Sequence, residues 1–183
     1  MNEQFIGIPW LTRLPFAYCG NVTPLETKFR EEMEEYSKQI AIEFKLQGSN
    51  GVDFMLTDKG VTVIEVNPRF QGSIDTVELS TGLNVFDAHI KSFFGELPEL
   101  RESRCFAAKN IIYTDRKLEI KRALSDTLVK YMGIGKAADI PRLGQEIHPD
   151  EPVTTILAAA GSRKMVQYKI SRTARYIKNK TEV

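Results

Sequence analysis

Two acids, an amide and a guanidinium are spaced so that one β-hairpin would bring them to a single face. Asp53 and Glu65 lie on two predicted strands, and Asn67 and Arg69 follow Glu65 in steps of two. Because side chains alternate along a strand, residues two apart share a face. Carboxylate and amide oxygens are hard ligands that Mg²⁺ prefers, and a guanidinium can hold a phosphate through two parallel hydrogen bonds. The pattern therefore predicts a site for magnesium and phosphate groups.

The register of this hairpin follows from its predicted turn. A three-residue loop at Asp58–Gly60, between strands at 52–57 and 61–66, places Asp53 opposite Glu65. Cβ atoms of residues paired in this way are about 4.5–5.5 Å apart, so the two charges repel unless a cation lies between them. The other face is wholly apolar and is expected to be core. It carries Phe54, Leu56, Ile64 and Val66.

A purely structural interpretation is open for the two acids alone. An exposed Asp–Glu pair on a hairpin is not unusual, and Arg69 could simply neutralise it. Further polar residues at fixed offsets favour a binding site. Asn67 and Gln71 flank Arg69 at two residues on either side, and Pro68 fixes the backbone where the chain leaves the strand.

The composition sets limits on the class of protein. Lys and Arg number 25 against 24 Asp and Glu, a net charge of +1, so no overall field argues for nucleic acid or an anionic membrane. Cys19 and Cys105 fit no CxxC pattern and are expected to be free thiols. No secretory signal and no apolar run of about 18 residues is present, so we expect a cytoplasmic setting. The basic C-terminal end has two open interpretations, a solvated helix or a surface that docks on an acidic partner chain.

Helices and strands are expected in an order without regular alternation, which predicts an α+β fold. The expected helices cover about 24–46, 75–80, 85–94, 121–131 and 162–178, and the expected strands 5–11, 16–19, 52–57, 61–66, 106–114 and 153–159. The charged segment 99–104 suggests two domains. Residues 1–98 would form a lobe with the hairpin, and residues 99–183 a small α/β subdomain with a basic terminal helix. Because an expected strand stands almost at the first residue, we expect an upstream portion that is missing or encoded separately.

The residues around the hairpin resemble a known family. Gly51–Phe54 and Ile64–Arg69 are similar to the magnesium- and phosphate-binding hairpin of the ATP-grasp superfamily, which includes biotin carboxylase, carbamoyl-phosphate synthetase and D-alanine–D-alanine ligase. Within it, residues 1–98 resemble archaeal-type predicted carboligases related to biotin carboxylase. The resemblance implies the C-terminal lobe of that fold, an antiparallel sheet with flanking helices.

The resemblance also implies roles for individual residues. Asp53, Glu65 and Asn67 would bind the metal ions, magnesium or manganese, between the phosphates of ATP. Arg69 would be the catalytic contact to the reacting phosphate or acyl phosphate. Gln71 occupies a polar position of the same loop. The nucleotide would thus meet Glu65, Asn67, Arg69 and Gln71.

The implied activity is that of an ATP-dependent carboxylate–amine ligase, or a similar ligase, acting through an acyl phosphate. Its partners would be ATP and a carboxylate substrate, with no nucleic acid and no membrane. The sequence departs from the family because the lysine-bearing small lobe and the adenine hinge are absent. We therefore expect an upstream lobe on a separate chain, or a homo-oligomer. The alternative is a non-catalytic ATP-grasp-derived subunit, or a truncated fragment, that binds a partner chain.

Overall fold

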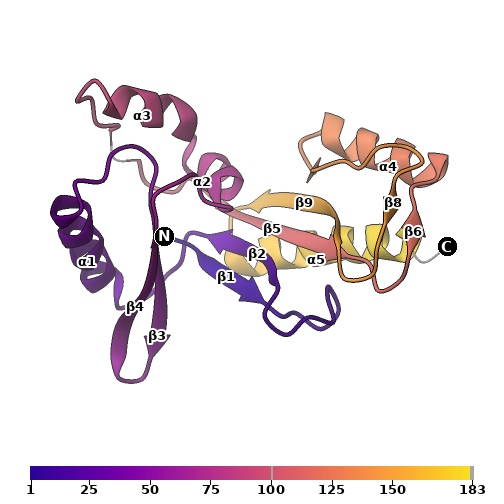
Figure 1. The fold of residues 1–183 in the computed structure, drawn as a ribbon, viewed down its shortest axis with the longest axis horizontal. Coiled ribbons are helices and arrows are strands. Elements are labelled where there is room, and N and C mark those ends of the chain that lie inside the picture. The colour runs from indigo at the N-terminus through magenta and orange to yellow at the C-terminus, as the bar shows by residue number, and fades with distance from the viewer. Residues whose placement is uncertain (100, 182–183) are drawn as a thin grey trace.

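The computed structural model describes residues 1–99 and 101–181 (Figure 1). The strands of this part of the chain are β1 (Glu3–Ile6), β2 (Tyr18–Thr23), β3 (Gly51–Thr57), β4 (Gly60–Asn67), β5 (Phe106–Tyr113), β6 (Leu118–Glu119), β7 (Ala137–Ala138), β8 (Glu146–Ile147) and β9 (Pro152–Ala160). The helices are α1 (Arg30–Glu43), α2 (Ile74–Thr81), α3 (Val85–Ser92), α4 (Arg122–Gly133) and α5 (Arg163–Thr181). None of these helices is long and apolar enough to cross a membrane.

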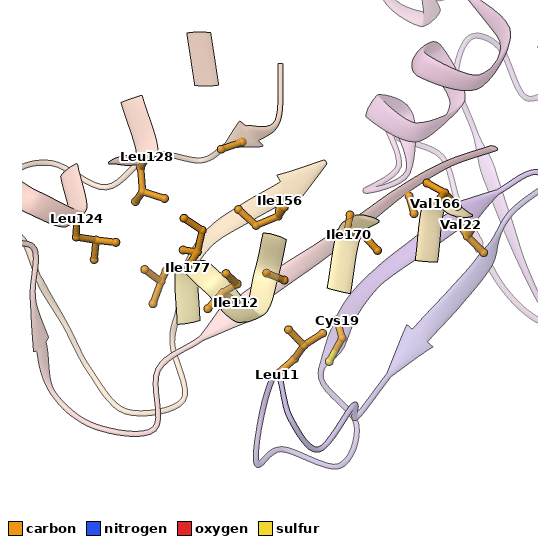
Figure 2. Close-up of a cluster of buried hydrophobic side chains, with 14 of the residues drawn as sticks. Leu11, Cys19, Val22, Ile112, Leu124, Leu128, Ile156, Val166, Ile170 and Ile177 are labelled. Carbon is orange, nitrogen blue, oxygen red and sulfur yellow. The ribbon is translucent and has the colours of Figure 1, made fainter. Parts of the chain in front are cut away.

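A five-stranded sheet in the order β1-β2-β5-β9-β7 forms the centre of the molecule, and its neighbouring strands are antiparallel. The long helix α5 packs along β5 and β9, where alternate strand residues are apolar (Figure 1). Figure 2 shows the resulting core, in which Ile112 and Ile156 of the strands meet Ile170 and Ile177 of α5. All four isoleucine side chains are buried. The predicted α+β class, with antiparallel sheets and flanking helices, is confirmed.

The side of the central sheet toward α2 is polar. Asn21 of β2 donates to the hydroxyl of Thr76 at 2.6 Å, and the Thr76 and Thr23 hydroxyls lie 2.9 Å apart. The Lys109 ammonium of β5 lies 3.0 Å from the Asp75 carboxylate at the start of α2. These contacts fix α2, and with it the end of the loop that follows Arg69, to the sheet.

The central sheet crosses the expected domain boundary. Strands β1 and β2 precede residue 98, whereas β5, β7 and β9 follow it. Leu11 and Val22 belong to the same buried cluster as Ile112 and Ile156. The division at residue 98 therefore does not separate two independent cores.

The predicted start of the first long helix is wrong. Strand β2 continues to Thr23, and α1 begins only at Arg30. Thr23, directly before the expected helix, could have capped its N-terminus, but its hydroxyl contacts that of Thr76 instead. A tertiary contact has thus taken the group that would have satisfied the helix N-terminus.

Candidate metal and phosphate site

The hairpin β3–β4 forms a two-stranded sheet of its own. Asp53 pairs with Glu65, as predicted, but the turn differs from the prediction. Thr57 pairs with Gly60, so the turn has two central residues, and a β-bulge between Asp53 and Phe54 shifts the register by one. Ile64 is the extra residue of the bulge, and it restores the pairing of the two acids.

The apolar side chains of the hairpin are not core, contrary to expectation. Ile64 is 54% exposed and Leu56 36% exposed, and Phe54 and Val66 of the same predicted face are only half-buried. These side chains stay exposed because the hairpin is a separate sheet. The apolar face of the central sheet is covered by α5 and does not pack on the hairpin. At this end of the molecule α1 lies beside the hairpin (Figure 1).

The pKa values of the Asp53 and Glu65 carboxyl groups are shifted in different ways. Burial, followed by the hydrogen bond and charge of Glu65, raises the pKa of Asp53. The Gln4 amide donates to Asp53 at 3.1 Å and opposes this shift. Glu65 accepts a hydrogen bond from the Asn67 amide at 2.8 Å, and this bond is the main reason that the pKa of Glu65 is lowered. The two carboxyl groups thus have pKa values shifted in opposite directions.

Arg69 continues this chain of polar contacts. Its guanidinium donates to the Asn67 amide oxygen at 3.3 Å and to the Phe70 carbonyl oxygen at 3.1 Å. The Arg69 side chain is exposed to solvent, as are those of Glu65 and Phe70. Asp53, Glu65, Asn67 and Arg69, which the sequence predicted on one face, are thus connected in a continuous series of interactions.

Gln71 supports the loop. Its amide donates to the backbone carbonyl oxygens of Asn67 at 3.1 Å and of Arg69 at 2.7 Å. The side chain lies so close to Gly51 that a Cβ added there would be 2.2 Å from the Gln71 Cδ. Gly51 is therefore needed for the packing of the loop against the start of β3. A direct contact of Gln71 to a nucleotide stays a prediction.

The donor set fits a magnesium ion that keeps phosphate and water ligands. The Asp53 and Glu65 carboxylates are neighbours, and their repulsion adds to burial in raising the pKa of Asp53, so a divalent cation between them would be favourable. The Asn67 amide adjoins them, with its nitrogen toward Glu65 and its oxygen toward Arg69. In residues 1–99 and 101–181, no group of three or more His, Cys, Asp or Glu side chains is gathered into a metal site. Octahedral coordination would thus need oxygens from phosphates and water.

Sequence reasoning missed several residues near the site. Gln4 contacts Asp53 from β1, and the Lys109 ammonium, 9% exposed, lies 5.8 Å from the centre of the Tyr18 ring. Burial raises the pKa of Tyr18 well above its ordinary value, and Asp75 and Asp53 add to the effect. One signal was present in the sequence, because Lys109 is a lone charge within the apolar strand at 106–113.

Part of the chain is similar to a known family. Residues 1–73 match the family model described as ATP-grasp domain. The chain is 26% identical to the uncharacterized protein MJ0776 of Methanocaldococcus jannaschii, over 99% of this chain and 45% of that protein.

Solved structures show the same fold. The L-amino acid ligase of Bacillus licheniformis matches with a TM-score of 0.67 and 18% identity, over 88% of this chain and 44% of the ligase. The biotin carboxylase domain of Hydrogenobacter thermophilus 2-oxoglutarate carboxylase, solved with MgADP and bicarbonate, matches with a TM-score of 0.65 and 17% identity, over 90% of this chain and 39% of that domain. The chain thus spans less than half the length of each of these proteins.

Proposed function

We propose that this chain provides the magnesium- and phosphate-binding part of an ATP-dependent carboxylate ligase. The carrying observation is the Asp53–Glu65 pair, which a bulge keeps in register and which Asn67 connects to Arg69. The match of residues 1–73 to an ATP-grasp domain supports nucleotide binding. The structural similarity to an amino acid ligase and to a biotin carboxylase domain supports chemistry on a carboxylate or bicarbonate.

In this proposal Asp53, Glu65 and Asn67 hold magnesium, which offsets the negative charge of the phosphates when bound. Ionised Glu65 is available as a ligand over a wide pH range, because the Asn67 amide lowers its pKa. The Gln4 amide orients Asp53 from β1. These residues contribute by position and charge, and none has to act as a nucleophile.

Arg69 has the second role. Its bond to the Asn67 oxygen is long, at 3.3 Å, and its side chain is exposed, so the guanidinium can turn toward a phosphate. In the proposed reaction a substrate carboxylate takes the γ-phosphoryl group and ADP leaves. An amine or similar nucleophile then attacks the acyl carbon and phosphate departs. Arg69 would steady the phosphoryl group in both steps.

A second candidate is a non-catalytic subunit that binds a partner chain. Its support is an exposed apolar surface around α3, where the side chains of Phe86, Phe94 and Leu97 are 63%, 78% and 88% exposed. Exposed apolar patches of this kind often mark protein interfaces.

Calorimetric titration with manganese and ATP tests the proposal. The wild-type chain should bind with a saturable heat, and Glu65→Gln should abolish it, because the amide removes a metal ligand and its charge. Glu35→Gln, at an exposed position of α1, is the matched control and should bind like wild type. Equal binding by Glu65→Gln would refute the site assignment. If wild type itself does not bind, the second candidate is favoured.

A further inference from the structure

His89 on α3 lies where two segments of the candidate site meet. Its Nδ1 accepts a hydrogen bond from the Ser49 backbone N–H at 2.9 Å, just before β3 begins. Its ring packs on Phe70, which follows Arg69, with 4.6 Å between centroids, and on Phe93 at 5.1 Å. We propose that His89 is a positioning residue that holds the Arg69 loop against the entry to β3, a role that rests on the proposed function of the hairpin.

The bond to Ser49 fixes the state of the imidazole ring. Because Nδ1 accepts a hydrogen bond from the Ser49 N–H, the ring proton of neutral His89 is on Nε2. The chain closes tightly around this nitrogen, since a Cβ added at Gly48 would lie 2.2 Å from Nδ1. Gly48 also has a φ of +74°, which glycine adopts without strain. The 48–49 segment is thus shaped to receive the ring.

The route from His89 to Arg69 is short. The Arg69 guanidinium donates to the Phe70 carbonyl oxygen, and the Phe70 ring lies against the imidazole. A shift of His89 would therefore move the backbone at residue 70 and the anchor of the guanidinium. Gln71 joins the same two segments a second time through its packing on Gly51.

The metal ligands are held differently. Asp53 and Glu65 are paired within the hairpin by the strand ladder and its bulge, and His89 contacts neither strand residue. Loss of His89 should therefore weaken the phosphate contact of Arg69 while leaving the metal ligands in place. If His89 served only the general stability of the chain, its loss would weaken metal binding and phosphate binding alike.

Two substitutions test the hydrogen bond of His89 and its ring packing separately. Asn in place of His89 keeps an acceptor near the position of Nδ1 but loses the ring packing on Phe70. Phe keeps the ring but leaves the Ser49 N–H without its acceptor. We expect His89→Asn to weaken manganese–ATP binding about tenfold, with manganese binding alone unchanged. His89→Phe should show a smaller loss, and Lys91→Ala, exposed on the same helix, none.

A double-mutant cycle with Arg69→Ala decides whether the effect runs through Arg69. Adding His89→Asn to Arg69→Ala should cause no further loss of affinity. An equal loss in both backgrounds, or wild-type affinity in a folded His89→Asn variant, would overturn the inference.

An NMR measurement tests the inference even if the chain binds no nucleotide. In wild type, coupling across the hydrogen bond should connect the Ser49 nitrogen to the His89 Nδ1. The Arg69 Nε–H resonance should shift in His89→Asn and stay in place in Lys91→Ala. Absence of the coupling, or an unmoved Arg69 resonance, would refute the positioning role independently of the proposed function.

Discussion

At the scale of single residues, Asp53 and Glu65 are paired carboxyl groups whose pKa values are shifted in opposite directions. Burial and the charge of Glu65 raise the pKa of Asp53, whereas the Asn67 amide lowers the pKa of Glu65. Ionised Glu65 therefore favours folding above its ordinary pKa, and this contribution is lost as the pH falls. For Asp53 the protonated form favours folding, and its contribution is lost as the pH rises through its pKa in the folded protein.

This asymmetry predicts that Asp53→Asn stabilises the metal-free chain at neutral pH. The amide can still accept the hydrogen bond of Gln4 but carries no charge, and the gain should be a few tenths of a kcal/mol, since the site is largely exposed. The gain should vanish as the pH falls below 3.8, the ordinary value for aspartate. Urea unfolding of both proteins at pH 7 and pH 3.5 measures this difference. A less stable variant at pH 7 would contradict the expected sign.

The residues of the candidate site were accessible to sequence reasoning because they are close in sequence. Strand alternation alone brings Glu65, Asn67 and Arg69 together. Lys109 and Asp75 were missed as a pair, because they are 34 positions apart and no local pattern connects them. The same holds for Gln4 and Asp53, which are 49 positions apart.

At the scale of elements, α2 is fixed to the central sheet by polar contacts that the sequence did not reveal. Asn21 is fully buried, accepts a hydrogen bond from the Tyr18 hydroxyl at 2.7 Å and donates to Thr76. The helix predicted from about residue 24 begins later for the same reason, since the hydroxyl of Thr23 belongs to this group. A side chain that could cap a helix can instead form a hydrogen bond with a residue distant in the sequence, as Thr23 does here with Thr76.

Asn21→Ala should therefore destabilise the chain by about 1–3 kcal/mol, because the half-buried hydroxyl of Tyr18 and the buried hydroxyl of Thr76 each lose a partner. Chemical denaturation measures the change in the free energy of unfolding. Gln39→Ala, exposed on α1, serves as the control and should change the stability by less than about 0.5 kcal/mol. A similar small effect for Asn21→Ala would mean that these hydrogen bonds do not hold α2.

At the scale of the whole molecule, the core and the candidate site are in different places. The core lies between the central sheet and α5, whereas the hairpin extends from this body with much of its apolar surface exposed (Figure 1). The sequence predicted the strands of the hairpin but placed its apolar face in the core. Alternation shows which residues share a face, but it cannot show whether another element covers that face.

Amide hydrogen exchange should reflect this arrangement. Amides in β3 and β4 should exchange faster than those in β5 and β9, because a two-stranded sheet with exposed faces opens without disrupting the core. Manganese with ATP should slow exchange in the hairpin and leave the central sheet unchanged. Equal protection of hairpin and central sheet in the free protein would show that they unfold as one unit.

The bulge at Ile64 has a consequence for insertions and deletions in this hairpin. The two-residue turn alone would place Asp53 opposite Ile64, and the extra residue returns it to Glu65. A three-residue turn would place Asp53 opposite Glu65 without a bulge, so over the same length of chain the shorter turn needs the bulge and the longer turn does not. Turn length and bulge are therefore expected to vary together among chains in which the two acids keep this spacing in the sequence.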